Sequence, residues 1–245
     1  MEEEYGKISA GSYDLNKWLY GGYEIDVISM IAGPPGSGKT NFCMLAAASQ
    51  AKKGKKVLFI DTEGGFSVSR LKQIVGEDID NILENILLLN PTDFSEQKKI
   101  LLDLPKKVLK DHINLIIIDG MAMLYRLELG DAVKMKDTEV IRDINRNVAH
   151  QMRALAEISR KQKIPIIITN QVYSMFIPEQ DREKGIVNET HLVGGDLFKY
   201  WSKCIIELKN EGSRKKAILL KHRHLPVKEL TFEIKNKGIF KKGWI

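Results

Sequence analysis

The chain has few of the residues that mark secreted or metal-stapled proteins. Its 245 residues include two cysteines and seven prolines, and 7% are aromatic. Cys43 and Cys204 lie far apart, with no second cysteine or histidine at metal-ligand spacing, which favours reduced thiols over a structural zinc site. No proline- or serine-rich linker, low-complexity tract or internal repeat divides the chain. These absences indicate a single globular unit in a reducing compartment.

Long apolar segments are also missing. The chain begins with the acidic MEEEYG and no apolar signal segment, and the longest aliphatic runs, such as Leu115–Ile118, are far too short to cross a bilayer. Nevertheless, 43% of the residues are hydrophobic, enough for a sizeable core. We therefore expect a cytoplasmic protein that is neither secreted nor inserted in a membrane.

Positive charge is concentrated near the C-terminus. Of the net charge of +6, residues 199–245 carry +9, from thirteen Lys or Arg and four Glu, which leaves −3 for residues 1–198. Such a basic segment is typical of a nucleic-acid partner, although a solvated lysine-rich face has the same composition. The charge alone leaves both interpretations open.

Short aliphatic runs recur between segments of helical periodicity. Runs without polar alternation predict parallel strands buried on both faces, here residues 27–33, 56–61, 85–90, 114–119 and 164–169. Helices are predicted for residues 39–53, 94–110 and 138–162. The last one has a core-facing stripe formed by Val140, Ile144, Val148, Met152, Leu155 and Ile158.

The pattern changes after Gly195, where polar and apolar residues alternate and predict an antiparallel extension of the sheet. Residues 172–195 lack periodicity, and such long irregular segments are usually functional. The predicted fold is α/β, with a doubly wound, mainly parallel sheet and an antiparallel C-terminal extension. We expect one domain over residues 1–245, made of a lead-in (1–25), a nucleotide-binding core (26–195) and the basic extension (196–245).

The strongest motif directly follows the first predicted strand. It fits G-x-x-x-x-G-K-[ST] and consists of Gly33, Pro34, Pro35, Gly36, Ser37, Gly38, Lys39 and Thr40. In such a loop, backbone N–H groups surround phosphates at the positive end of a helix. Lys39 is expected to contact the β and γ oxygens of ATP, and Thr40 to bind Mg²⁺.

Polar residues also follow three other predicted strands. Asp119 ends residues 114–119 and is expected to provide a second contact to Mg²⁺. Glu63 is a candidate general base, and the amide of Gln171 could sense the γ-phosphate. Parallel strands end at a common edge, where α/β proteins bind ligands. The alternative for each residue is a polar side chain that satisfies a turn or a loop.

The motifs GPPGSGKT, DTEGGF, LIIIDG and ITNQV, in that order after GSYDLNKWLYGG, resemble the ATPase core of the RecA/RadA recombinases over nearly the whole chain. DTEGGF, TNQV and KHRHLP together resemble the RadB family, the short archaeal RadA paralogues. The resemblance implies a RecA-like P-loop ATPase core. It also implies that Glu63 is the catalytic glutamate and Gln171 the strand-end glutamine of that family.

Basic and aromatic residues provide candidates for further contacts. Lys221 and Arg223 point to one face of a predicted strand end and could stabilise γ-phosphate charge, in trans or as a nucleotide cap, contact DNA, or face solvent. Tyr125 and Arg126 match the first DNA loop of the recombinases and could either stack on single-stranded DNA or pack in a helix.

Lys215 and Lys216, in a predicted turn, are the most exposed candidates for DNA phosphates, and a solvated lysine face is the alternative. His222 and His224 have no acidic partner in sequence, so no metal is expected there.

The resemblance implies a weak, Mg²⁺-dependent ATPase that binds single-stranded or branched DNA and assists homologous recombination and repair. RadA or a Holliday-junction nuclease are candidate partners, and homo-oligomerisation is open. Alternatives are a strand-exchange recombinase, a non-hydrolysing ATP-switched adaptor, and a RecA-like clock or helicase ATPase. Only 32 residues precede Gly33, so no helix-hairpin-helix domain or polymerisation linker is expected. Residues 172–196 carry a net charge of −3, which disfavours strand exchange.

Overall fold

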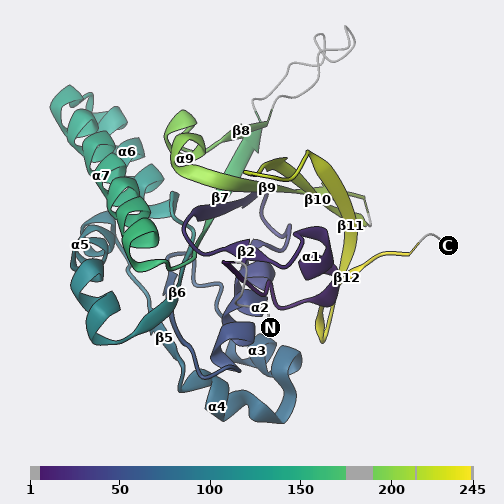
Figure 1. Cartoon of the computed structure of the whole chain (residues 1–245). Coiled ribbons are helices and arrows are strands. Elements are labelled where there is room, and N and C mark those ends of the chain that lie inside the picture. Colours follow the sequence, from purple (N-terminus) through teal and green to yellow (C-terminus); the bar gives the residue numbers. More distant parts are fainter. Residues whose placement is uncertain (1–5, 175–189, 213, 244–245) are drawn as a thin grey trace, which may run out of the picture.

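The computed structural model describes residues 6–174, 190–212 and 214–243. In that part of the chain the central element is a ten-stranded sheet with the order β12-β11-β10-β9-β3-β7-β6-β4-β5, to which β8 is added by pairing with β7 (Figure 1). The strands of this sheet are β3 (Ile28–Gly33), β4 (Lys56–Asp61), β5 (Ile86–Leu89), β6 (Ile113–Asp119), β7 (Ile166–Ser174), β8 (Thr190–Leu192), β9 (Ser202–Glu211), β10 (Arg214–Lys221), β11 (Lys228–Lys235) and β12 (Gly238–Lys241). A separate two-stranded sheet pairs β1 (Lys7–Ile8) with β2 (Tyr23–Glu24).

Helices cover both faces of the large sheet. One hydrophobic cluster lies on the side of α1 (Tyr13–Trp18), α2 (Lys39–Ala51), α3 (Val68–Val75) and α4 (Ile79–Leu83), with the 3₁₀ helix η2 (Gly76–Asp78) between the last two. The second cluster lies on the side of α5 (Phe94–Lys110), α6 (Met123–Met135), α7 (Thr138–Gln162) and α9 (Asp196–Trp201). This arrangement confirms the predicted doubly wound α/β class.

The central strands are buried on both faces because their side chains alternate between the two clusters. In β6, Leu115 and Ile117 pack in the cluster beneath α2, while Ile116 and Ile118 pack in the other. The five predicted parallel strands and the three predicted helices are confirmed. The prediction that every one of these strands is buried was wrong for β5, which is the edge strand and is partly exposed.

Two details of the long segments differ from the predictions. Val140 is 42% exposed and does not belong to the core stripe, and the first buried residue of α7 is Ile144. Figure 1 gives the reason, since the first turns of α7 extend beyond the sheet. The segment predicted to be irregular starts as strand, because β7 continues to Ser174 and pairs with β8 through Val172 and Leu192.

The C-terminal extension is antiparallel only in its later strands. The unpredicted helix α9 reverses the chain, so that β9 runs parallel to β3, with Ala32 opposite Glu207. From β9 onward, β10, β11 and β12 are joined in antiparallel order. The strand around Cys204 is therefore mixed, parallel to β3 on one side and antiparallel to β10 on the other, and the predicted antiparallel extension is confirmed from the pairing of β9 with β10 onward. Both cysteines are free, as predicted, and both are buried.

Residues of the lead-in contact the last described strand. The hydroxyl of Ser12 donates to the carbonyl of Ile239 at 2.6 Å, and the backbone N–H of Lys241 donates to Asp14 Oδ2 at 2.8 Å. Leu15 and Trp18 of α1 are buried in the same cluster as α2. The N-terminal lead-in is thus packed against the C-terminal strands.

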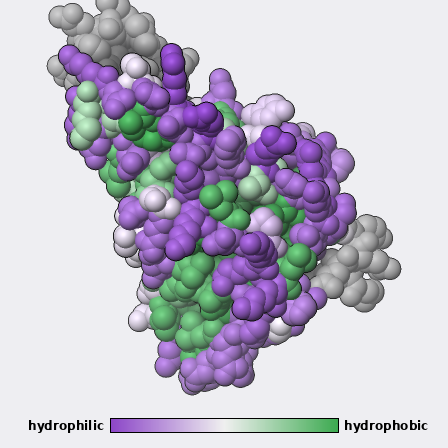
Figure 2. Space-filling view, turned by 90° about the vertical axis from the view of Figure 1, so that its left-hand side faces the viewer, coloured by the Kyte–Doolittle hydropathy of each residue, from purple (hydrophilic) through white to green (hydrophobic). Residues whose placement is uncertain are grey.

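The opposite side carries α5, α6 and α7. Figure 2 shows apolar areas among hydrophilic surface on this face, and Leu102 and Leu109 of α5 are among the exposed hydrophobic side chains. None of the helices in residues 6–174, 190–212 and 214–243 combines the length and the apolar character that a bilayer crossing requires.

The C-terminal strands share a core with the helix that follows the phosphate motif, because Phe232 of β11 packs edge-on against Phe42 of α2 at 5.5 Å between ring centroids. We predict that Phe232→Ala lowers the free energy of unfolding by about 3 to 5 kcal/mol in urea denaturation. Phe240→Ala, at an exposed position of β12, is the control and should cost less than about 1 kcal/mol. Equal small effects would mean that the extension folds independently of the core.

Candidate functional site

The phosphate loop, residues 33–40, connects the end of β3 to the start of α2. Gly36 and Gly38 have φ angles of +70° and +106°, which residues with a side chain rarely adopt. A Cβ at Gly38 would also lie 2.8 Å from the Cδ1 of Ile234 in β11. No side chain caps α2, and its first turn holds no acidic residue. The positive end of this helix is therefore left for an anion.

Lys39 is the buried cation of the loop. Its Nζ donates to the carbonyl oxygens of Gly33 and Pro34, at 2.9 and 3.1 Å. Burial lowers the pKa of Lys39, and the negative charges of Glu63 and Asp119 oppose that shift. Because charge-assisted bonds to phosphate are stronger than bonds to neutral carbonyls, the ammonium can exchange these carbonyls for phosphate oxygens.

Asp119 is a buried carboxylate at the end of β6, 1% exposed. Its Oδ1 accepts a hydrogen bond of 2.6 Å from the hydroxyl of Thr169, whereas Oδ2 has no hydrogen-bond partner among the described residues. Burial raises the pKa of Asp119, and the nearby hydroxyl groups of Thr169 and Thr40 offset part of that effect. An orphaned carboxylate oxygen in a buried position calls for a cation or an ordered donor.

The unpartnered oxygen and the Thr40 hydroxyl border the same small space. A Cβ built at Gly65 would lie 3.1 Å from Thr40 Oγ1 and 3.7 Å from Asp119 Oδ2, so one point beside Gly65 is close to both atoms. Mg²⁺ accepts hydroxyl and carboxylate oxygens, and it completes its octahedron with phosphate oxygens and water. The residues present therefore fit a magnesium ion bound together with a nucleotide.

Asp61, which the sequence analysis did not single out, builds the loop that presents Glu63. It is buried at the end of β4, beside Asp119 in the sheet register. Its carboxylate accepts the backbone N–H groups of Glu63, Gly65 and Phe66, at 3.2, 3.2 and 2.8 Å. The sequence feature that could have identified Asp61 is its position directly before Thr-Glu-Gly-Gly. Asp side chains commonly accept hydrogen bonds from the N–H groups of a turn that follows them.

Glu63 and Gln171 meet across the sheet edge. The amide Nε2 of Gln171 donates to Glu63 Oε1 at 3.1 Å, and Gln171 lies opposite Gly33 in the strand register. A Cβ at Gly120, whose φ is +92°, would lie 2.7 Å from Glu63 Cγ, so the missing side chain leaves room for the glutamate. The two candidates are brought together next to the phosphate loop, with Glu63 exposed to solvent.

Thr169 and Asn170 connect these residues to the rest of the sheet edge. The hydroxyl of Thr169 accepts from the backbone N–H of Gly120 at 2.7 Å while it donates to Asp119. The amide of Asn170 donates to the carbonyl of Val193 at 2.8 Å and so anchors the segment after β8. Both residues lie at a strand end. Their sequence pattern is the same as that of polar side chains that only form hydrogen bonds within a loop.

Lys221 and Arg223 lie at the opposite edge of the sheet from the phosphate loop. Because β10 is antiparallel to β9, Lys215 lies at the phosphate-loop edge and Lys221 at the other. Lys221 Nζ donates to the carbonyl of Lys199 at 2.9 Å, and Arg223 Nη1 contacts both carboxylate oxygens of Asp26, at 2.9 and 3.1 Å. A role in capping the nucleotide of the same chain is therefore wrong, and a role in trans stays a prediction.

Tyr125 is not available for stacking on a base. It is 6% exposed in α6, and its hydroxyl donates to Asn145 Oδ1 of α7 at 2.7 Å. The packing alternative is the right one for this residue. Arg126 is exposed and lines a small cavity together with Glu63 and Gln171, so it stays a candidate for a DNA contact.

Lys215 and Lys216 are not free surface cations, contrary to prediction. Lys215 Nζ donates to the carbonyl of Gly36 in the phosphate loop at 2.6 Å and to Asn210 Oδ1 at 2.9 Å. Lys216 pairs with Glu211 at 3.0 Å and Glu229 at 3.2 Å, and hydrogen bonds to these carboxylates raise its pKa. Strand pairing, which the turn-like sequence did not reveal, places both lysines next to these partners.

The acidic segment predicted to match the second DNA loop, residues 172–196, lies in large part outside the described residues. Its first residues, to Ser174, belong to β7, and its last part includes β8 and the turn before α9. The expectation drawn from its net charge stays a prediction.

Comparisons with known proteins agree with this geometry. A family profile described as Rad51 matches residues 2–242. The chain is 38% identical over 242 residues to a protein of Methanobrevibacter smithii, covering 97% of each chain. It is 39% identical over 226 residues to a protein of Methanococcus maripaludis and 36% identical over 226 residues to one of Methanocaldococcus jannaschii. These matches cover 92% of this chain and 96% and 98% of the relatives.

Each of these relatives is named DNA repair and recombination protein RadB. The profile and the relatives span nearly all of the chain, and the phosphate loop, strand-end carboxylates and mainly parallel sheet agree with them. The chain therefore belongs to the RadB family of the Rad51/RecA recombinases.

Proposed function

We propose that the protein binds ATP with Mg²⁺, hydrolyses it slowly, and serves homologous recombination and DNA repair as an accessory DNA-binding protein. One observation carries the proposal: Lys39, Thr40, Asp119 and the Glu63–Gln171 pair lie together at one sheet edge, where a buried carboxylate oxygen has no hydrogen-bond partner among the described residues. A loop that only stabilised the fold would not need a buried ammonium and an unsatisfied buried carboxylate next to each other.

The side chains can be assigned successive tasks. Lys39 exchanges the carbonyls of Gly33 and Pro34 for phosphate oxygens and stabilises charge there. Mg²⁺, when bound at Thr40 and Asp119, neutralises the charge of the β and γ phosphates. Glu63 orients the attacking water and accepts its proton. Gln171, which holds Glu63 in the structure, can turn its amide to the γ-phosphate and free the carboxylate.

Slow hydrolysis is expected because the single chain neither shields this site from water nor brings Lys221 and Arg223 to it. Glu63 is exposed, so bulk water is not excluded from the reacting groups. Lys221 and Arg223 lie at the opposite sheet edge and cannot stabilise the γ-phosphate of their own chain. If they act in trans, turnover rises when copies assemble.

A role in recombination and repair is supported by the names of the relatives, all DNA repair and recombination proteins. The net charge of −3 over residues 172–196 disfavours a strand-exchange loop. We therefore favour DNA binding in support of RadA or a junction nuclease. Arg126, exposed beside Glu63 and Gln171, is the candidate that would connect DNA to the nucleotide.

The test measures ATP turnover with and without single-stranded DNA, together with a strand-exchange assay on the same preparation. The proposal expects slow turnover, little stimulation and no efficient strand exchange. Efficient exchange would establish a recombinase instead, and ATP binding without any turnover would establish a non-hydrolysing adaptor.

Asp119 provides a test of the magnesium site that also changes stability. Because burial raises the pKa of Asp119, its charged form destabilises the fold at pH values above that pKa. We predict that Asp119→Asn raises the Tm of the nucleotide-free protein at neutral pH and that the gain shrinks as the pH falls through that pKa. Mg²⁺ with ATP should raise the Tm of the wild type but not of the variant. If MgATP raises the Tm of the wild type and of Asp119→Asn equally, Asp119 does not bind the magnesium ion.

Glu63 can be tested as the general base. We predict that Glu63→Gln keeps ATP affinity and slows hydrolysis at least about tenfold, because general-base catalysis typically contributes roughly 10² to 10⁴. Steady-state phosphate release measures the rate, and fluorescent-nucleotide titration measures the affinity. Glu77→Gln, at an exposed glutamate of η2, is the matched control and should leave both unchanged. An unaltered rate in Glu63→Gln assigns this residue to structure.

The contact of Lys215 with the phosphate loop has a measurable consequence. Since its ammonium holds the Gly36 carbonyl at 2.6 Å, we predict that Lys215→Ala weakens ATP binding roughly three- to tenfold, the net contribution of one ordinary hydrogen bond. Lys209→Ala, which removes a lysine of β9 paired with Glu207, is the control and should leave the Kd for ATP unchanged. If Lys215→Ala instead lowers the affinity for DNA and leaves the affinity for ATP unchanged, Lys215 contacts DNA and does not support the phosphate loop.

A further inference from the structure

Two glutamines are buried side by side where α5 packs against α7. Gln97 of α5 is 0% exposed, and Gln151 of α7 is 2% exposed. The amide Nε2 of Gln97 donates to Gln151 Oε1 at 2.9 Å. Figure 1 shows both helices on the same side of the large sheet, and their buried apolar residues, such as Leu101 and Met152, belong to one hydrophobic cluster. Glutamine is mostly an exposed residue, so a buried pair in an apolar cluster needs an explanation.

One atom of each amide is left without a hydrogen bond. Gln97 Oε1 and Gln151 Nε2 are buried and have no partner in the parts of the chain that the structure describes. An unsatisfied acceptor or donor in the core lowers the stability of the fold. Two apolar side chains of the same size would pack the helices together without that cost. Packing of α5 on α7 therefore does not account for this pair.

The other hydrogen bond of Gln97 reaches the loop of residues 120–122, which follows Asp119. The amide Nε2 of Gln97 donates to the backbone carbonyl of Met121 at 3.3 Å. On the other side of the loop, the backbone N–H of Met121 donates to the carbonyl of Thr169 at 3.0 Å. The loop is thus held between α5 and β7.

This loop forms one wall of the space around the proposed general base. Gly120 and Ala122 line a small cavity together with Glu63 and Gln171. A Cβ at Gly120 would lie 2.7 Å from Glu63 Cγ, so the backbone of the loop is in close contact with the glutamate. A shift of the loop would therefore move the groups next to Glu63 and the backbone that directly follows Asp119.

We propose that Gln97 is a positioning residue for ATP hydrolysis. It holds residues 120–122 where Glu63 and Asp119 can act on the nucleotide, and Gln151 orients its amide. The protein gives up some stability for this placement. The inference deepens the proposed function and rests on it, because it concerns the hydrolysis step assigned to Glu63. The alternative is a pair that only fixes how α5 and α7 pack against each other.

The test replaces both glutamines by methionine in the full chain. Methionine has nearly the same length and volume but no amide, and the double variant Gln97→Met, Gln151→Met leaves neither partner alone in the core. The matched control is Gln50→Met, which removes another buried glutamine whose Nε2 has no partner among the described residues. Gln50 lies on the last turn of α2, about 16 Å along that helix from Lys39. Tm, the Kd for ATP and steady-state turnover are measured for the wild type and both variants.

The double variant and the control should both have a Tm equal to or above that of the wild type, because each loses unsatisfied amide atoms. Only the double variant should lower kcat, by about fivefold or more, since small displacements of reacting groups are costly. Its Kd for ATP should stay that of the wild type, because the phosphate loop is unchanged. A pair with only a packing role would lower Tm and kcat together, or leave kcat unaltered; either result overturns the proposal.

Hydrogen–deuterium exchange tests the position of the loop without turnover. Without nucleotide, a peptide spanning residues 117–123 should exchange faster in the double variant than in the wild type or in Gln50→Met. Unchanged exchange of this peptide would overturn the inference even if kcat falls. A wild type that binds ATP without hydrolysing it would contradict the proposed function instead, and faster exchange confined to the double variant would still identify Gln97 as the residue that holds the loop.

Discussion

The organisation of the nucleotide edge depends on one buried charge, the carboxylate of Asp119. Its Oδ1 is satisfied by the Thr169 hydroxyl of β7, which at the same time accepts the backbone N–H of Gly120. The Thr62 hydroxyl of the β4 loop donates to the carbonyl of Gly120 at 2.8 Å. Three strand ends are thereby locked around a carboxylate whose other oxygen finds no partner in the part of the chain that the structure describes. Burying this charge is unfavourable without a cation, which is the stability cost that the proposed Mg²⁺ site would carry.

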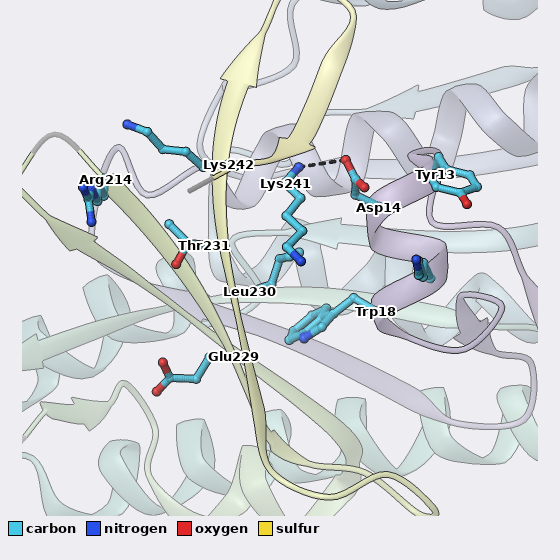
Figure 3. Close-up of a pocket in the computed structure, with 11 residues that line it drawn as sticks. Tyr13, Asp14, Trp18, Arg214, Glu229, Leu230, Thr231, Lys241 and Lys242 are labelled. Carbon is cyan, nitrogen blue, oxygen red and sulfur yellow. Dashed lines mark hydrogen bonds between the residues drawn. The ribbon is translucent and has the colours of Figure 1, made fainter. Parts of the chain in front are cut away.

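The C-terminal strands belong to this site as much as the parallel core does. A Cβ at Gly33 would lie 2.8 Å from the carbonyl of Leu208, and one at Gly38 would meet Ile234. Lys215 adds a hydrogen bond to the phosphate loop from β10. The basic residues of the extension are therefore divided by the faces and edges of the sheet: some support the phosphate loop, some pair with glutamates, and others line a groove between α1 and the C-terminal strands (Figure 3). Total charge in a segment does not predict that division.

The predictions that failed share a physical cause. Tyr125 next to Arg126 has the composition of a stacking site, but the periodicity of α6 turns the ring into the core. Lys216 in a turn-like sequence was expected in solvent, but antiparallel pairing places it between Glu211 and Glu229. The strand around Cys204 is antiparallel to β10 as expected, but its other neighbour, β3, runs parallel to it. In each case the contacts made in the folded chain, and not the local composition, decide where the side chain lies.

The sequence by itself determined the α/β class, the positions of the parallel strands, the phosphate loop and the strand-end residues Asp119, Glu63 and Gln171, because hydrophobic periodicity and a loop built for phosphate are local properties. Tertiary structure alone decided the contacts between segments. It joined Gln171 to Glu63, left Asp119 Oδ2 unpartnered, moved Lys221 away from the phosphate loop and opened the groove between α1 and β11. These features follow from strand order and direction, which bring residues more than a hundred positions apart into contact.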